Sequence, residues 1–323
     1  TGANNTAVGR QALSNNTASN NVGVGFYALI NNVGGTQNTA VGGNCLDANT
    51  SANNNTAVGY NSMGSNTTGV QNVSVGSESL AANTTGNNNT AIGQNSLNSN
   101  TTANDNTAVG QSAMAANTTG TQHVAVGAFS LDANTTGNRN TAIGHSALTA
   151  NTTGNENTAI GPHALFVNTT GNYNIAIGSN TGDANTTGSD NSFIGTAAGG
   201  ANSTGSSNIA LGSVALFSNT SGNNNTALGK SALQNSTTAS SNTAVGNSAL
   251  VATTTGSNNT ALGINALATN TTGVGNIAVG FAAARLQTTA NYNTVVGYDA
   301  LDANETGTGI VAIGYQSLTS NTA

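Results

Sequence analysis

Residues 89–105 read NTAIGQNSLNSNTTAND, and residues 106–122 read NTAVGQSAMAANTTGTQ. The two stretches have the same length, and each places a glycine directly after a short run that contains β-branched residues. The unit recurs along the whole chain, because an anchor glycine stands at Gly9, at Gly25 and then at every seventeenth residue as far as Gly314. Only the first step, from Gly9 to Gly25, is one residue shorter. Nineteen copies of fixed period are typical of a repeat architecture such as a solenoid.

Without the repeat, the composition would indicate disorder. Of the 323 residues, 4% are charged, 4% are aromatic and 36% are hydrophobic, while 42 are glycine. Chains this poor in apolar side chains usually cannot bury enough surface to fold. A disordered linker, however, has no reason to keep register over nineteen copies. We therefore expect a folded repeat protein, and not an ordinary enzyme with a large aromatic core.

Several functional classes are excluded by what the composition lacks. No apolar run approaches the 18 residues of a membrane-spanning helix. Cys45 has no partner in the chain, so a disulfide scaffold is excluded. The net charge is −6 and no basic cluster occurs, which argues against nucleic acid as a partner.

Each copy can be numbered from its anchor glycine as position 0. Position −1 is Val, Ile or Leu in all nineteen copies, position +4 is Leu in 14 and Met in two, and position −2 is nearly always Ala. Asn dominates positions −4 and +7, and all 14 charged residues lie at −5, +1, +2, +5 or +8. These patterns predict a core built from positions −1 and +4, a tight space at −2, a half-buried column at −3, and exposed corners. They also predict files of Asn whose amides bond along the axis.

The segment before each anchor glycine alternates and is β-branched, which predicts a strand, and the Ala-Leu segment after it allows a second short strand. Gly at positions 0 and +10 suits turns with positive φ. No Asn-Gly dipeptide occurs, which argues against hairpins. We predict an all-β parallel β-solenoid, or β-roll, of 19 coils of 17 residues that forms one continuous domain over residues 1–323. At about 4.8 Å per coil, it would be roughly 90 Å long.

One pair of copies departs from the pattern in a correlated way. Gly182 and Gly199 replace Leu at position +4 of consecutive copies, and Phe193 replaces Ala at position −2 between them. The larger Phe side chain would fill the space that the two missing Leu side chains leave. This predicts that positions −2 and +4 lie close together inside the coil.

The segments NIAIG (174–178), NIAVG (276–280) and HVAVG (123–127) resemble the core of the YadA-type head repeat of trimeric autotransporter adhesins. The chain also resembles NTAIG-x-x-AL repeats of tail-fibre-like surface proteins. The family repeat is usually about 14 residues long, and here an N-T-T-G segment lengthens it. The resemblance implies a left-handed parallel β-roll, a homotrimer, and an extracellular adhesive or spacer role.

Residues that could carry chemistry are few and scattered. His123, His145 and His163 occupy three different positions, so exposed corners are expected for them in place of a metal or acid–base site. The acidic residues share corner positions on separate copies and are expected to be solvated: Asp47, Asp132, Asp183, Asp190, Asp299 and Asp302. Cys45, at position +3, is expected to be a small buried hydrophobe. The sequence predicts no catalytic, cofactor-binding or metal-binding residue and no cofactor.

Two recurring patterns allow a second interpretation. Asn-x-Thr sequons such as those at Asn83 and Asn151 are glycosylation acceptors in a suitable host, although we expect their Asn and Thr to serve the turn. Thr files at positions +8 and +9, such as Thr84 and Thr85, suggest an array that binds ice. Neighbouring residues of a strand point to opposite sides, however, and these positions look like a turn.

Nearly identical coils suit a ruler better than a catalytic site, which needs a unique constellation. The first hypothesis is therefore an extracellular structural or adhesive fibre, a rigid spacer on a cell or virion surface that self-associates as a homotrimer or end to end in filaments. The chain begins and ends inside a repeat, so we expect a section of a longer fibre. The alternative is a surface that binds ice or glycans through Thr ladders or corner residues such as Tyr60, Tyr298 and Tyr315. A third, a tail-fibre enzyme that cleaves saccharides, has the least support.

Overall fold

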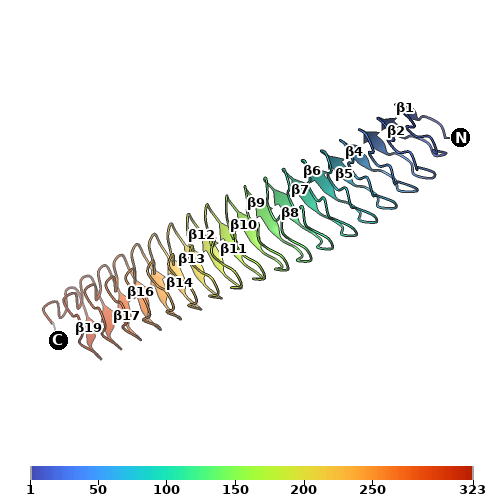
Figure 1. Ribbon diagram of the computed structural model, residues 1–323. Helices are drawn as coiled ribbons and strands as arrows, with labels where there is room; N and C mark the ends of the chain where they lie inside the picture. The colour runs from blue at the N-terminus through green and yellow to red at the C-terminus, as the bar shows by residue number, and fades with distance from the viewer. Residues whose placement is uncertain (1, 322–323) are drawn as a thin grey trace. The chain divides into compact units, whose positions relative to one another are not determined.

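A computed structural model describes residues 2–321, and over this range the chain is an all-β parallel β-solenoid with a 17-residue repeat (Figure 1). Each three-residue strand is the segment directly before an anchor glycine, and no helix occurs among the described residues. The strands are β1 Thr6–Val8, β2 Val22–Val24, β3 Thr39–Val41, β4 Thr56–Val58, β5 Val73–Val75, β6 Thr90–Ile92, β7 Thr107–Val109, β8 Val124–Val126, β9 Thr141–Ile143, β10 Thr158–Ile160, β11 Ile175–Ile177, β12 Ser192–Ile194, β13 Ile209–Leu211, β14 Thr226–Leu228, β15 Thr243–Val245, β16 Thr260–Leu262, β17 Ile277–Val279, β18 Thr294–Val296 and β19 Val311–Ile313.

The chain divides into two compact units, 1–157 with β1–β9 and 158–323 with β10–β19. In each unit, consecutive strands are parallel and paired in register with the next copy, as β3 is with β4 and β17 with β18. The predicted parallel stacking is therefore confirmed within both units. That residues 1–323 form one continuous domain stays a prediction.

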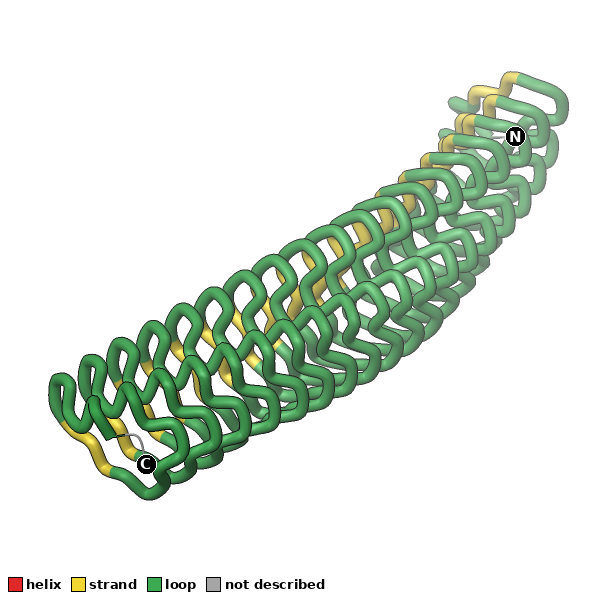
Figure 2. Tube along the Cα trace, turned by 60° about the vertical axis from the view of Figure 1, so that its left-hand side comes forward, coloured by secondary structure: helices red, strands yellow, loops and turns green. Residues whose placement is uncertain are grey.

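The predicted second strand is wrong. Positions +1 to +7 form consecutive turns, and the single strand of each coil lies on one side of it (Figure 2). The reason is the backbone conformation, since positions +2 and +4 are left-handed in every coil, as at Asn95 (φ 56°) and Leu97 (φ 49°). A left-handed Leu costs about 1–2 kcal/mol. Complete burial of its side chain contributes about 1.5–3 kcal/mol, so burial outweighs the strain.

The anchor glycines have positive φ, from 123° at Gly9 to 144° at Gly263 and Gly297, as predicted. The expectation was wrong for position +10, because none of the described glycines there has positive φ. A side chain at position +10 would instead collide with the neighbouring coil, as at Gly86, where it would meet the carbonyl of Ala103 and the amide of Asn83. Close approach between coils, and not φ, therefore favours glycine at position +10.

The core lies between the strand and the turn segment of each coil. In unit 2 it is built mainly from Ala at positions −2 and +3 and Leu at position +4, such as Ala227, Ala232 and Leu233, which have no exposed surface. The prediction that position −1 belongs to this core is wrong, because every position −1 residue is half-buried or exposed. In a strand, neighbours point to opposite sides. Since Ala at position −2 points inward, positions −3 and −1 point outward.

The predicted compensation around Phe193 is confirmed. Phe193 is fully buried, and a Cβ placed on Gly182 or Gly199 would lie 2.9 Å or 2.8 Å from its ring. A similar exchange occurs in β18, where buried Val295 replaces Ala and the preceding coil carries Ala284 in place of Leu. The space under the strand is therefore shared between positions −2 and +4, and a large residue fits at one only where the other is small.

Replacing Gly199 with Leu tests this sharing of volume. Leu residues at the same position elsewhere have φ near 50°, and Gly199 has φ 60°, so the backbone accommodates Leu and only space is lacking. We expect Gly199→Leu to lower the free energy of unfolding by about 1–3 kcal/mol. Phe193→Ala alone should cost about 3–5 kcal/mol, and the double variant should cost less than the sum of the two. Purely additive losses in thermal or urea unfolding would contradict this arrangement.

Candidate functional site

The outward side chains of the strands form a surface that recurs in every coil, here called the strand face. It consists of positions −3 and −1, which flank the buried residue of each strand. Position −3 is Thr in eleven copies and Val, Ile or Ser in the others, and position −1 is always Val, Ile or Leu. In each unit, the strand face therefore presents a file made mostly of Thr, Val and Ile at position −3, beside an unbroken file of Val, Ile and Leu at position −1.

The strand face is apolar, uncharged and open to solvent. Ile177 and Ile143 are 37% and 38% exposed, and no residue of the face is buried. No Lys, Arg, Asp or Glu occurs at either position. Monomeric soluble proteins rarely expose a continuous apolar patch that extends this far, and such patches usually mark an interaction site. The strand face is the strongest functional candidate in the structure.

The two Asn files lie inside the coils, as predicted. At position −4, the backbone N–H of Asn89 donates to Asn72 Oδ1 at 2.9 Å, and its Nδ2 donates to the Ala103 carbonyl at 2.9 Å. At position +7, Asn83 Nδ2 donates to Asn66 Oδ1 at 2.8 Å and to the Gly86 carbonyl at 3.0 Å. Most of these buried amides are thus satisfied by bonds within their own coil and to a neighbouring coil, and a buried polar group without such partners would be costly.

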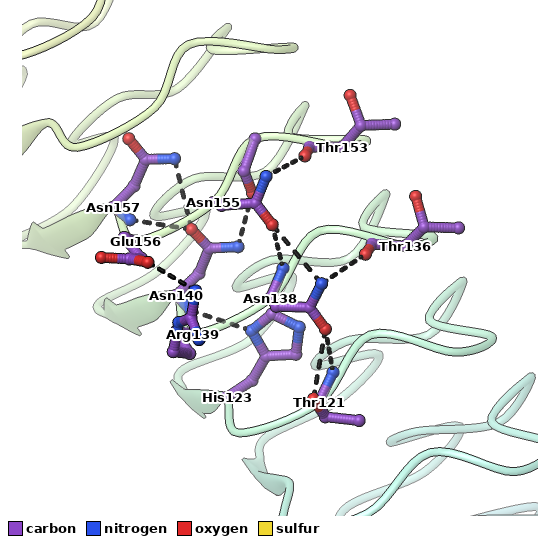
Figure 3. Close-up of polar contacts among 11 residues, drawn as sticks. Thr121, His123, Thr136, Asn138, Arg139, Asn140, Thr153, Asn155, Glu156 and Asn157 are labelled. Atoms are coloured by element: carbon purple, nitrogen blue, oxygen red, sulfur yellow. Dashed lines mark hydrogen bonds and ion pairs between the residues drawn. The ribbon is translucent and has the colours of Figure 1, made fainter.

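His123 takes the place of one of these Asn residues, so the expectation of an exposed corner is wrong for it. Its side chain is buried, and Nε2 donates to the Gly137 carbonyl at 2.7 Å. Nδ1 accepts from the Asn140 N–H at 3.0 Å (Figure 3). The neutral imidazole supplies one donor and one acceptor, as the Asn amide does. Burial lowers the pKa of His123 from 6.5 to about 4.

A second polar ladder runs along the surface beside His123. Thr121 N–H donates to Asn138 Oδ1 at 2.9 Å, and Asn138 N–H donates to Asn155 Oδ1 at 2.8 Å (Figure 3). Next to it, the guanidinium of Arg139 pairs with Glu156 one coil away at 2.6 Å. Both partners are substantially exposed, and such pairs contribute little to stability.

The Asn file at position +7 is interrupted in unit 2. Ser236 and Thr253 replace Asn in consecutive coils, and Gln287 follows Asn270. In the described chain, Ser236 Oγ and Asn270 Oδ1 are buried without a hydrogen-bond partner. Thr253 Oγ1 still reaches the Asn270 carbonyl at 3.1 Å. The axial amide bonding is therefore weakest in these coils.

The remaining candidate residues are dispersed along the chain. His145 and His163 are exposed, and residues 2–321 contain no group of three His, Cys, Asp or Glu side chains that could hold a metal ion. Burial raises the pKa of the half-buried carboxyls of Asp47, Asp132 and Asp183.

The other acidic candidates and Cys45 show no arrangement that points to chemistry. Asp302 accepts two hydrogen bonds from Arg285 at 3.0 Å, beside the half-buried Asp299, whereas Asp190 is exposed. Cys45 is buried, as expected, and burial raises the pKa of its thiol to about 12, so it is not a reactive thiolate.

The Asn of the sequons at position +7 serves the turn, as expected. Asn83 and Asn151 are fully buried, so a sugar on either amide would have no path to solvent. The hydroxyl of Thr84 donates to the Thr101 carbonyl at 3.1 Å, whereas Thr85 is exposed. Of the two Thr files, position +8 is thus occupied by the fold itself.

The corner tyrosines are exposed but not equivalent. Tyr60 is 57% exposed. Tyr298 is stacked between Phe281 and Tyr315, with ring centroids 5.0 Å and 5.6 Å apart. Stacking covers the ring faces that would otherwise receive a ligand, and it leaves their edges exposed.

No protein-family model matches the chain, and no curated protein matches its sequence significantly. The described residues include no helix long and apolar enough to cross a membrane.

Sequence reasoning missed the strand face and the location of His123. For the strand face, the signal was the alternation of the strand, since the invariant Ala at position −2 and the aliphatic residue at position −1 cannot both point inward. For His123, the signal was its place in a column otherwise occupied by Asn.

The buried imidazole of His123 should make stability depend on pH. The unfolded chain binds a proton near pH 6.5 and the folded chain near pH 4, so the free energy of unfolding falls as the pH drops through this interval. At pH 5, the loss should be about 2 kcal/mol, from about 1.4 kcal/mol per pH unit. His123→Asn should remove it, so that the variant is more stable than the native chain at pH 5 and similar at pH 8. Identical pH profiles in thermal unfolding would contradict the prediction.

Restoring the Asn file should stabilise unit 2. In Ser236→Asn, the new amide would have Asn219 Oδ1 and the Ala239 carbonyl as acceptors, by analogy with the bonds that Asn219 makes to Asn202 and Gly222. We expect a gain of about 1 kcal/mol in the free energy of unfolding. Ser65→Asn, at an exposed position, is the matched control and should change stability little. Hydrogen exchange of unit 2 amides measures the effect, and a loss of protection would refute the expectation.

Proposed function

We propose that this chain is a segment of an extracellular structural or adhesive fibre on a cell or virion surface, and that its strand face packs against further copies of the same chain. The observation that supports the proposal is the strand face itself, which is uncharged, aliphatic and repeated in every coil. A partner that matches this face along its length must repeat at the same spacing of about 4.8 Å. A second copy of the chain has that spacing.

The uniformity of the coils supports a mechanical role over catalysis. Most buried amides are bonded to a neighbouring copy, so these polar groups are used by the fold and are not available to a substrate. The resemblance to YadA-type head repeats favours three chains as the assembly. End-to-end association of separate chains into filaments is compatible with the same role.

Ice is the competing occupant of the strand face. The observation in its favour is the Thr that occupies position −3 in eleven of the nineteen copies, exposed or half-buried in a file beside the aliphatic one. Thermal hysteresis of a solution of the purified chain would favour ice over self-association.

Charges introduced into the strand face should break the assembly. We expect the native chain to be oligomeric by light scattering, and Val75→Lys, Val109→Lys and Val126→Lys together to weaken association at least a hundredfold. The reason is that a charge buried without a partner costs about 3–5 kcal/mol.

The matched control places three lysines at exposed corners, as Gln94→Lys, Gln111→Lys and Asn247→Lys. This variant should assemble as the native chain does, and circular dichroism should show that both variants are folded. A monomeric native chain, or equal dissociation of both variants, would refute self-association through the strand face.

A further inference from the structure

A groove of about 500 Å³ lies on the turn segments of unit 1, formed by positions +2, +5 and +6 of successive coils. These positions of the repeat differ from positions −3 and −1, which form the strand face. Its lining includes Glu78, Asn95, Asn98, Ser112, Ala115 and Asp132. The volume lies within the range of sites for small molecules, about 300–1,000 Å³.

Small side chains open the groove at this place. Ala115 stands at position +5, where other coils carry Phe166 and Phe217. Both Phe side chains are accommodated with about two-fifths of their surface exposed. The same backbone therefore tolerates a large side chain at this position, and the groove exists because of the residues that the sequence places in these coils.

The floor of the groove is rigid and internally bonded. The Asn95 N–H donates to the Ser77 carbonyl at 3.1 Å, and the Ser112 N–H donates to the Gln94 carbonyl at 2.9 Å. Asn98 Nδ2 donates to the Glu78 carbonyl at 2.9 Å, which ties one wall across a coil. A preorganised site loses little entropy on binding.

The side chains that remain carry donors and acceptors. Within residues 2–321, the structure gives the Asn95 amide and the Ser112 hydroxyl no internal hydrogen bond, and both side chains are half-buried. Carboxylates of Glu78 and Asp132 stand at the two ends, and the lining contains no Lys or Arg. Amides, hydroxyls and carboxylates together bind the alternating donors and acceptors of sugar hydroxyls.

The spacing of the carboxylates argues against a small cation. Glu78 and Asp132 belong to coils three repeats apart, which is about 14 Å along the axis at 4.8 Å per coil. One metal ion cannot contact both. An elongated ligand with many hydroxyls reaches both ends and the amide and hydroxyl between them.

We propose that the groove from Glu78 to Asp132 binds a neutral oligosaccharide that lies along the solenoid axis. The site is independent of the self-association proposed above, because none of its lining residues belongs to the strand face. Loss of one activity therefore does not imply loss of the other.

The test is titration of the full chain with neutral glucose, galactose, xylose and N-acetylglucosamine oligosaccharides, followed by calorimetry and ligand-observed NMR. At least one should bind the native chain, and Ala115→Phe, which fills the groove, should weaken it at least tenfold. Val251→Phe, at the same position in a coil outside the groove, is the control and should bind as the native chain does. Circular dichroism confirms that both variants are folded.

A second pair of variants avoids added bulk. Asn95→Gly and Asn265→Gly both replace a left-handed Asn at position +2, and glycine adopts that conformation without strain. Only Asn95→Gly should weaken binding. The proposal is overturned if no neutral oligosaccharide binds, if Ala115→Phe leaves binding unchanged, or if the polyamine spermidine binds the groove and the sugars do not.

Discussion

The buried Asn amides are the constraint on which the rest of the structure depends. An amide without partners inside a coil would cost about 1–3 kcal/mol. Its donors and acceptors are met by the copy of itself one coil away, as Asn83 is by Asn66. This fixes the register between coils, because a slip of one residue would leave every amide of both files unsatisfied. The pairing of each Asn with its counterpart in the neighbouring coil is therefore an energetic requirement and not only a pattern of the sequence, and it is kept even across the 16-residue step, where Asn32 bonds to Asn16.

Once the register is fixed, the interior is narrow. Most coils hold one buried Leu at position +4, in a left-handed conformation that its burial makes favourable. Little more than a methyl group fits beneath the strand, and so position −2 is Ala. The exchange at Phe193 shows the limit, since that ring is accommodated only where Gly182 and Gly199 leave room.

The narrow interior sends the larger aliphatic residues outward. A strand of three residues has one inward and two outward positions, and the inward one is taken by Ala. The Val, Ile and Leu of position −1 are then left on the surface without internal partners. A chain whose core consists mainly of Ala and Leu thus carries a large part of its apolar surface outside, and this surface is the candidate for its function. The outward side chains of the turn segments are mostly polar. The proposed saccharide groove exists there because the size of the side chain at position +5 differs from coil to coil, unlike the residues of the strand face.

The sequence by itself determined the repeat, the parallel stacking, the buried Asn files, the inward Ala and Leu, and the contact of Phe193 with two glycines. Each of these follows from identical residues that recur at one spacing, so that pairing a copy with the next satisfies all of them together. Only the tertiary structure decided that position −1 faces solvent, that the Ala-Leu segment is a series of turns, and that His123 replaces a buried Asn. The physical reason is that Val and Ile are more hydrophobic than Ala, so the sequence alone favours position −1 for the core. The width of the closed coil is not visible in a single copy, and it leaves room beneath the strand only for the smaller Ala side chain.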